Sequence, residues 1–234
     1  MIFWWRCIMV LGLFTLIPVM AIAGDIVGEI ISVEGKVTLR DDKARKKEAK
    51  VGMTVEVGQM IKTSNSGKIK IRLADESVFK IASGSTFILD NFLLEGSESR
   101  QMKARMLKGA LQYISKTVLF KKDSRKILLA NTAGAIRGTN FIGVVGRRIE
   151  AVLISGRVDF SARSNTVTLD KRGHAVTFEM SGKFEAVVLL PDSEIAAFGD
   201  RLGWKVELPS PVEGGARALS PTTCKLVGSR IFCG

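Results

Sequence analysis

The sequence is short of the side chains that most metal sites and acid–base sites require. Its 234 residues include one histidine, His174, three cysteines and one tyrosine. A lone histidine excludes a zinc site built from several imidazoles, and no second imidazole is present to assist it in catalysis. No phosphate-binding loop, dinucleotide fingerprint or EF-hand loop occurs, and no G-x-S-x-G elbow precedes His174. We therefore expect a protein that is not an enzyme and that binds no cofactor or metal ion.

His174 is the one residue on which a catalytic function could depend. It follows the turn formed by Lys171, Arg172 and Gly173, so we expect an exposed turn residue. A hydrolase that uses His174 remains as a third functional class, and this expected position argues against it.

Aromatic residues are also few, at 7%, whereas 35 basic residues against 23 acidic ones give a formal net charge of +12. This charge fits nucleic acid, anionic polymers or lipids of the cell envelope, or basic residues that protect the solvent faces and edges of strands. Nucleic acid is disfavoured because basic residues interleaved with an aromatic platform are missing. Residues 45–47, 121–126 and 147–148 are the candidate contacts for an anionic polymer.

Residues 1–23 are apolar and carry a single charge, Arg6. Gly12 and Pro18 interrupt the apolar core, and the small residues around Ala23 fit the rule for signal peptidase cleavage. We therefore expect a signal peptide cleaved after Ala23 and a mature chain in the periplasm. The alternative is an uncleaved membrane anchor, because the stretch is long enough to cross a bilayer.

Cleavage would remove Cys7 and leave two cysteines, Cys224 and Cys233, in an oxidising compartment. A two-residue turn at Gly228-Ser229 would pair Val227 with Arg230 and Cys224 with Cys233 across a hairpin. Cys224 and Cys233 then form a non-hydrogen-bonded pair, where side chains lie closest, so we expect a disulfide. Two free thiols on a frayed tail are the alternative.

Short β patterns dominate the mature chain, and no helical pattern longer than two turns is convincing. Turn glycines followed by alternating residues recur without a fixed period, which argues against a solenoid. Residues 24–190 are expected to form one all-β domain, a two-sheet sandwich of jelly-roll type. Residues 101–111 read as a loop followed by a strand. Residues 191–234 form a C-terminal appendage, with a short helix over 191–199 capped by Asp192, a linker and the cysteine hairpin.

The stretch from 128 to 145 is the centre of this pattern. Two apolar runs flank the break Thr132–Thr139, which predicts two buried strands joined through a tight kink. Gly138 indicates a backbone position with positive φ or a close approach of another strand. Arg137 is expected to be buried beside a carboxylate partner, because a lone buried charge is very costly.

The run T-x-x-A-I-R-G-T-N-F in this stretch resembles the signature of the FecR family, the periplasmic domains of iron-dicitrate-type sensor proteins. Other segments fall in the family's order: residues 51–64, 68–90, 106–114 and 154–160. The resemblance covers roughly residues 27–178. The signature residues, taken as structural, are Thr132, Ala135, Arg137, Gly138, Thr139 and Phe141.

The chain departs from the family's pattern at four places. Glu76 follows Asp75 where Asp-Gly is common, so the turn there is expected to be longer or of another type. Ala133 replaces a common proline, and Gln59 and Asn140 replace common aspartates.

The resemblance implies a sandwich fold and a non-enzymatic periplasmic module for sensing or protein interaction in envelope signalling. Sensors of this family carry a cytoplasmic segment before their membrane span, whereas here the apolar stretch starts at residue 2. We therefore expect an exported, stand-alone FecR domain that binds an envelope protein by strand addition. The alternative is a binder of anionic envelope polymer or carbohydrate.

Overall fold

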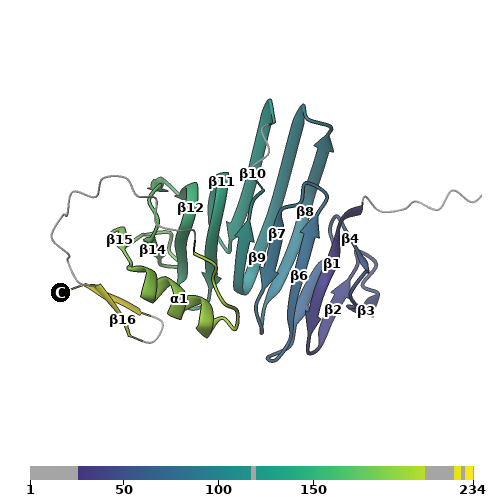
Figure 1. Cartoon of the computed structure of the whole chain (residues 1–234), viewed down its shortest axis with the longest axis horizontal. Coiled ribbons are helices and arrows are strands. Elements are labelled where there is room, and N and C mark those ends of the chain that lie inside the picture. Colours follow the sequence, from purple (N-terminus) through teal and green to yellow (C-terminus); the bar gives the residue numbers. More distant parts are fainter. Residues whose placement is uncertain (1–25, 117–119, 209–223, 228–229, 234) are drawn as a thin grey trace, which may run out of the picture.

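The computed structural model describes residues 26–116, 120–208, 224–227 and 230–233, and most of these residues belong to one sheet of 15 strands. One helix, α1 (Asp192–Arg201), accompanies the sheet, and β16 (Cys224–Val227) pairs with β17 (Arg230–Cys233) in a separate hairpin. Figure 1 shows the strands following one another along the long axis, with β1–β4 at one end and β14, β15 and α1 at the other. The predicted all-β fold is confirmed.

The sheet folds over into two layers. Layer 1 contains, in spatial order, β15 (Val188–Leu189), β14 (His174–Phe178), the first half of β12 (Ile149–Ala162), the second half of β11 (Thr132–Val145), the second half of β9 (Ser99–Ile114), β7 (Val78–Ile81), β6 (Lys68–Leu73), β1 (Ile26–Glu34) and β4 (Thr54–Glu56). Layer 2 contains β13 (Asn165–Leu169), the second half of β12, the first half of β11, β10 (Lys122–Leu129), the first half of β9, β8 (Thr86–Glu95), β5 (Met60–Thr63), β2 (Val37–Arg40) and β3 (Lys46–Glu48).

Three long strands, β9, β11 and β12, therefore run through both layers. β9 changes partners at Gly109, and β11 and β12 change register together around Gly138 and Gly156. These three glycines have φ values of +93°, +55° and +88°. The positive φ turns each strand out of one layer and into the other, which L side chains tolerate poorly. The layers of this sandwich are thus joined by continuous strands rather than only by loops.

A row of aromatic rings fills the space between the layers. Neighbouring ring centroids lie 4.8 to 6.4 Å apart, within the range of favourable ring contacts. Its members, in order, are Phe87, Phe79, Tyr113, Phe141, Phe160, Phe178 and Phe184. Phe79 and Phe87 come from opposite layers, as do Phe141 and Phe160, so these contacts hold the two layers face to face.

Alternation in the sequence follows this architecture closely on β6. Ile69, Ile71 and Leu73 are buried, while Lys70 and Arg72 on the other face are exposed.

Two expectations about where strands begin and end are wrong. Residues 101–108 belong to β9 rather than to a loop. Residues 132–139 belong to the single strand β11, because the chain reverses earlier, at Ala130 and Asn131, and only the kink at Gly138 interrupts it.

The predicted helix forms and packs on the outer face of layer 1. Ile195 and Phe198 of α1 join Ile142, Val152 and Ile154 of the sheet in a second apolar cluster. The N-cap is Pro191 and not Asp192 as predicted. Asp192 lies in the first turn instead, where its carboxylate accepts a hydrogen bond from Arg172 at 2.5 Å.

The chain continues from α1 across layer 1 toward β6. The Lys68 ammonium donates a hydrogen bond to the Gly203 carbonyl at 2.8 Å, and Trp204 and Leu208 pack against the second apolar cluster. At least residues 192–208 of the C-terminal appendage are therefore docked on the sandwich.

The turn between β6 and β7 is longer than a two-residue turn, which is one of the two outcomes predicted from its Asp75-Glu76 sequence. The Glu76 N–H donates to the Leu73 carbonyl, and the Leu73 N–H donates to the Ser77 carbonyl. This is a three-residue loop whose last residue adopts the left-handed conformation, and Glu76 does so with φ +63°.

We predict that Glu76→Gly raises the free energy of unfolding by about 0.5–1 kcal/mol, because glycine adopts this φ without strain. The ion pair of Glu76 with Lys116 is exposed and contributes little. The urea midpoint is the measurement. Glu76→Ala is the control, since it removes the carboxylate but keeps a Cβ, and an equal gain there would contradict the explanation.

The backbone of the C-terminal hairpin has the predicted register. Cys224 pairs with Cys233, Lys225 with Phe232, Leu226 with Ile231 and Val227 with Arg230. The turn residues 228 and 229 lie outside the described residues, and the disulfide itself stays a prediction.

Candidate functional site

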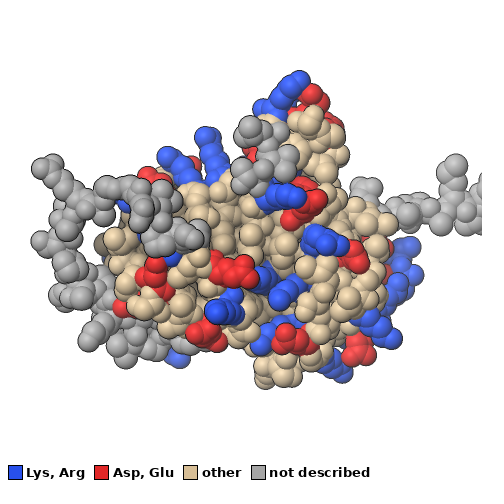
Figure 2. Space-filling model, in the orientation of Figure 1, with Lys and Arg blue, Asp and Glu red and all other residues tan. Residues whose placement is uncertain are grey.

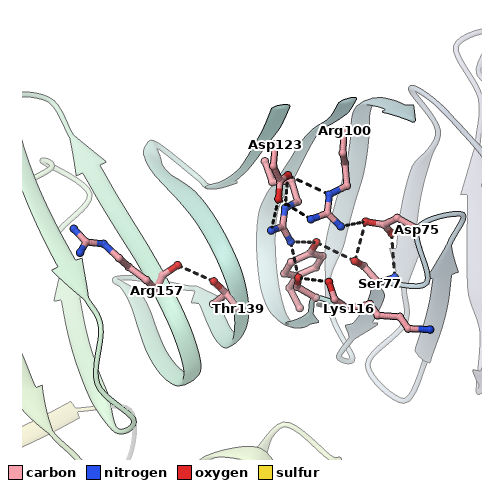
Figure 3. Close-up of polar contacts among 10 residues, drawn as sticks. Asp75, Ser77, Arg100, Lys116, Asp123, Thr139 and Arg157 are labelled. Atoms are coloured by element: carbon pink, nitrogen blue, oxygen red, sulfur yellow. Dashed lines mark hydrogen bonds and ion pairs between the residues drawn. The ribbon is translucent and has the colours of Figure 1, made fainter. Parts of the chain in front are cut away.

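The family signature forms the corner at which β11 and β12 pass from one layer to the other. The Thr139 hydroxyl is 1% exposed and donates to the Arg157 carbonyl of β12 at 2.7 Å, as drawn in Figure 3. Opposite it, a Cβ added at Gly156 would lie 1.9 Å from the Gly138 carbonyl oxygen. The corner therefore requires a glycine on β12 and a small hydroxyl residue on β11.

The six signature residues do not share one environment. Thr132 and Phe141 are fully buried and face the core, and Thr139 is buried at the corner. Ala135 and Arg137 are exposed on the outer face of layer 2. The structure thus supports a scaffolding role for the inward-facing members only.

The expectation that Arg137 is buried beside a carboxylate is wrong. Thr132, Gly134 and Ile136 point into the core, so strand alternation places Arg137 on the solvent side. Its charge is not costly there, and it forms no ion pair within the described residues.

Two other arginines are buried, and Figure 3 shows the polar contacts of one of them, Arg100. Arg100 of β9 is 1% exposed and Arg125 of β10 is 3% exposed. Both guanidinium groups bind the Asp123 carboxylate through two hydrogen bonds each, at 2.7 to 3.1 Å. Arg100 also donates to the buried Asp75 carboxylate at 2.8 Å. We call these residues, with Ser77 and Tyr113, the arginine cluster.

The arginine cluster ties the two layers together. Arg125 of layer 2 donates to the Tyr113 hydroxyl of layer 1 at 3.2 Å, and Tyr113 donates to Ser77 in the β6–β7 turn at 3.3 Å. The Phe120 ring lies 4.3 Å from the Arg100 guanidinium carbon. The cluster thus links Arg100 and Arg125 of layer 2 to Tyr113 and the β6–β7 turn of layer 1.

The charges of the arginine cluster cancel, since two guanidinium groups face two carboxylates. Burial disfavours the charged Asp123 side chain, but hydrogen bonds from Arg100 and Arg125 outweigh burial and hold its pKa below the ordinary value. Burial raises the pKa of Tyr113, which keeps the phenol protonated as a donor. The members satisfy one another's charges and hydrogen-bonding groups, so the arrangement stabilises the fold.

Strand alternation carried a signal for these buried arginines. Arg100 shares the inward face of β9 with Met102, Ala104 and Met106. Arg125 likewise shares the inward face of β10 with Ile127 and Leu129. The signal was hidden because residues 101–108 did not read as a strand.

Other polar side chains are each engaged separately. Asp75 binds Arg100, whereas Asp90 binds Arg105 through two hydrogen bonds of 2.6 Å. His174 is half-buried rather than exposed, at the start of β14, with Nδ1 3.4 Å from the Asp170 carboxylate. Burial lowers the pKa of His174.

Among the described residues, no group of three or more His, Cys, Asp or Glu side chains could hold a metal ion. The one helix in this part of the chain is too short and too polar to cross a membrane.

The edges of the two layers differ in how they are protected. At the N-terminal end of layer 2 the edge strand β3 is Lys-Lys-Glu and fully exposed, and Figure 2 shows basic side chains gathered at that end. Charged edges of this kind resist pairing with another chain. At the other end the edge strand β13, Asn-Thr-Val-Thr-Leu, has no charged residue, and among the described strands it pairs with β12 alone.

Residues 59–159 match the family described as FecR protein. Residues 59–159 thus correspond to a FecR domain. The matched segment contains every member of the arginine cluster. It also contains the signature corner, and it ends at Asp159. A FecR domain supports a role in signalling or sensing.

Structural comparison gives weaker likenesses. Two crystal structures of a proposed anti-sigma factor from Parabacteroides distasonis ATCC 8503, at 1.65 and 2.50 Å resolution, are 10% and 11% identical with TM-scores of 0.46 and 0.48. Each comparison covers 59% of this chain and 63% of the other, so this chain spans less than two thirds of those proteins. A structure titled "Cell surface anchoring domain" is 25% identical, with a TM-score of 0.26 over 27% of this chain and 83% of its own. No curated protein matches the sequence.

Proposed function

We propose that this protein is an exported, non-enzymatic FecR-domain protein that binds a protein partner in envelope signalling by adding a strand of the partner to β13. The FecR domain over residues 59–159 supports the signalling role. The uncharged, unprotected edge of β13 is the observation on which the binding mode rests.

The sequence of residues 1–23 supports export to the periplasm. Its apolar core and its small residues before Gly24 are typical of a cleaved signal peptide. We expect the chain recovered from the periplasm to begin at Gly24 and to hold Cys224 and Cys233 as a disulfide. A mature chain found in the cytosol with both thiols reduced would contradict export.

The hairpin between β12 and β13 determines which backbone groups of β13 are free. Ala162 pairs with Asn165 across a two-residue turn that contains Arg163 at φ +54°. In such a hairpin the flanking pair is hydrogen-bonded, and hydrogen-bonded pairs then alternate. Val167 therefore bonds to β12, while the N–H and C=O groups of Thr166 and Thr168 point away from it. These groups are available to the strand of a partner.

The test is capture of the partner from an envelope extract by immobilised mature protein and by two variants. Thr166→Pro removes one outward N–H without breaking the ladder with β12, because proline is tolerated where the N–H faces solvent. We expect wild type and Thr166→Val to retain the same partner in stoichiometric amount, and Thr166→Pro to lose it.

Retention of the partner by Thr166→Pro, or the absence of any stoichiometric partner, would contradict strand addition at β13. Capture by strand addition should also persist at high salt, because backbone hydrogen bonds and apolar contacts are screened little. Unchanged capture by His174→Ala would agree with a role that is not enzymatic.

The second candidate function is binding of an anionic envelope polymer. A specific arrangement of charge on the outer face of layer 2 favours it.

A further inference from the structure

The outer face of layer 2 carries basic residues placed directly beside one another. Lys103 of β9 and Lys126 of β10 are neighbours in the parallel ladder, and both are exposed. Arg137 of β11 and Arg157 of β12 are neighbours in the antiparallel ladder, and both are exposed. Like charges directly across a ladder are destabilising, so each pair costs the isolated protein stability. We call these four residues the basic face.

Acidic residues compensate this charge only in part. Asp159 lies 3.2 Å from Arg157, and its carboxylate also accepts a hydrogen bond from Thr168 at 2.6 Å. These contacts, together with the nearby charge of Arg137, hold the pKa of Asp159 below its ordinary value. Lys103, Lys126 and Arg137 form no ion pair within the described part of the chain. The nearby Arg105 is different, because Asp90 neutralises it.

Small side chains lie beside the basic pairs on β11 and β12. Ala135 lies between Lys126 and Asp159 in one row of the sheet. In the next row Ala133 pairs with Ser161, and Ser161 pairs with Thr166. The face is therefore flat beside the cations, so a ligand that contacts them can lie close to the backbone of β11 there.

The basic face spans four neighbouring strands with one cation on each. Neighbouring strands are about 4.8 Å apart, so the cations form a band across the strands rather than a pocket. A band suits a linear ligand with repeated negative charges and does not suit a single small anion. Ser161, Thr166 and Thr168 add hydroxyl groups beside the band, which can exchange hydrogen bonds with a ligand rich in hydroxyls.

We propose that the basic face binds a linear acidic polysaccharide, whose carboxylates pair with the cations and whose hydroxyls pair with the serine and threonine side chains. The outward residues of β9 to β13 include no aromatic ring on which the bases of nucleic acid could stack. This surface includes Lys126 from the segment 121–126 that the sequence put forward, but not residues 45–47 or 147–148. The inference rests on the second candidate function, for which it names the surface and the class of polymer, and it does not use the free backbone edge of β13.

The experiment measures binding of the purified mature protein to sodium alginate, a polyuronate, with uncharged dextran as the control polymer. The variant K103Q/K126Q/R137Q removes three charges from the basic face. The matched variant K43Q/K46Q/K47Q removes three charges from the exposed region around β3, where none of the three lysines forms an ion pair among the described residues.

We expect alginate to bind wild type and the β3 variant with similar affinity and to bind the basic-face variant about tenfold more weakly. Affinity should also fall steeply between about 0.05 and about 0.5 M salt, because the contacts are exposed and are screened. The melting temperature of the basic-face variant should not decrease, since the removed charges repel their neighbours.

Several results would overturn the proposal. One is equal weakening in the two variants, which would indicate attraction to net charge alone. Others are no binding to alginate at low salt, or equal binding to dextran. Tighter binding to phosphatidylglycerol vesicles, lost in the same basic-face variant, would assign the face to a lipid surface instead. None of these measurements involves the protein partner, so a failure here is distinct from a failure of strand addition.

Discussion

Gly156→Ala is expected to destabilise the protein by about 3 kcal/mol or more, which corresponds to a decrease in melting temperature of roughly 6–12 °C. The new Cβ would lie 1.9 Å from the Gly138 carbonyl oxygen and 2.8 Å from the Thr139 Cα. Both contacts are with backbone, so no side-chain rotation relieves them. The φ of +88° adds strain for any residue with a Cβ.

Gly138→Ala is the matched control, because it changes the other half of the same corner. Gly138 also has a positive φ, +55°, but no atom lies within 4 Å of the position of its Cβ. We expect a cost of about 1 kcal/mol from the backbone conformation alone. Urea denaturation of both variants separates the cost of the positive φ from the cost of the backbone clash. Equal losses would show that the corner of β11 and β12 can relax.

Asp75→Ala is the second large change, with an expected loss of about 3–5 kcal/mol. It leaves the Arg100 guanidinium, which is 1% exposed, without one of its two carboxylates. It also removes the acceptor of the Ser77 N–H and the Ser77 hydroxyl. A buried cation with too few partners is costly because water cannot replace the missing group.

Asp90→Ala is the control for this prediction, since Asp90 makes the same kind of bond to Arg105 near the surface. The side chain of Arg105 is 41% exposed, so the loss should be below about 1 kcal/mol. A second check is the double variant Asp75→Leu/Arg100→Met, which leaves Arg125 paired with Asp123. We expect it to be more stable than Asp75→Ala alone. A double variant that is less stable than the wild type would show that the buried ion pair contributes net stability.

Local residue patterns predicted much of the fold because they depend on neighbours in the sequence. Alternation on β6, the three-residue turn at Glu76 and the register from Cys224 to Cys233 each follow from a few consecutive residues. The bend at Gly138 was also predicted, since glycine after a polar residue in a strand marks an unusual backbone.

The expectation for Arg137 failed for a physical reason that applies to any strand. A residue within an apolar segment can face either side, and the side depends on where the strand begins. β11 begins at Thr132, so the even-numbered residues Thr132, Gly134 and Ile136 before the kink face the core and Arg137 faces solvent. The arginines that are buried, Arg100 and Arg125, lie in segments that are polar on average.

The sequence by itself determined that this chain is built from strands, where several of them turn, and that it resembles the FecR family. Only the tertiary structure decided that β9, β11 and β12 each cross between layers, that Asp75 meets Arg100, and that Lys103 adjoins Lys126. The reason is that these relations join residues 20 or more positions apart in most cases. Pairing between distant strands is decided by the whole packed core, which no short window of sequence contains.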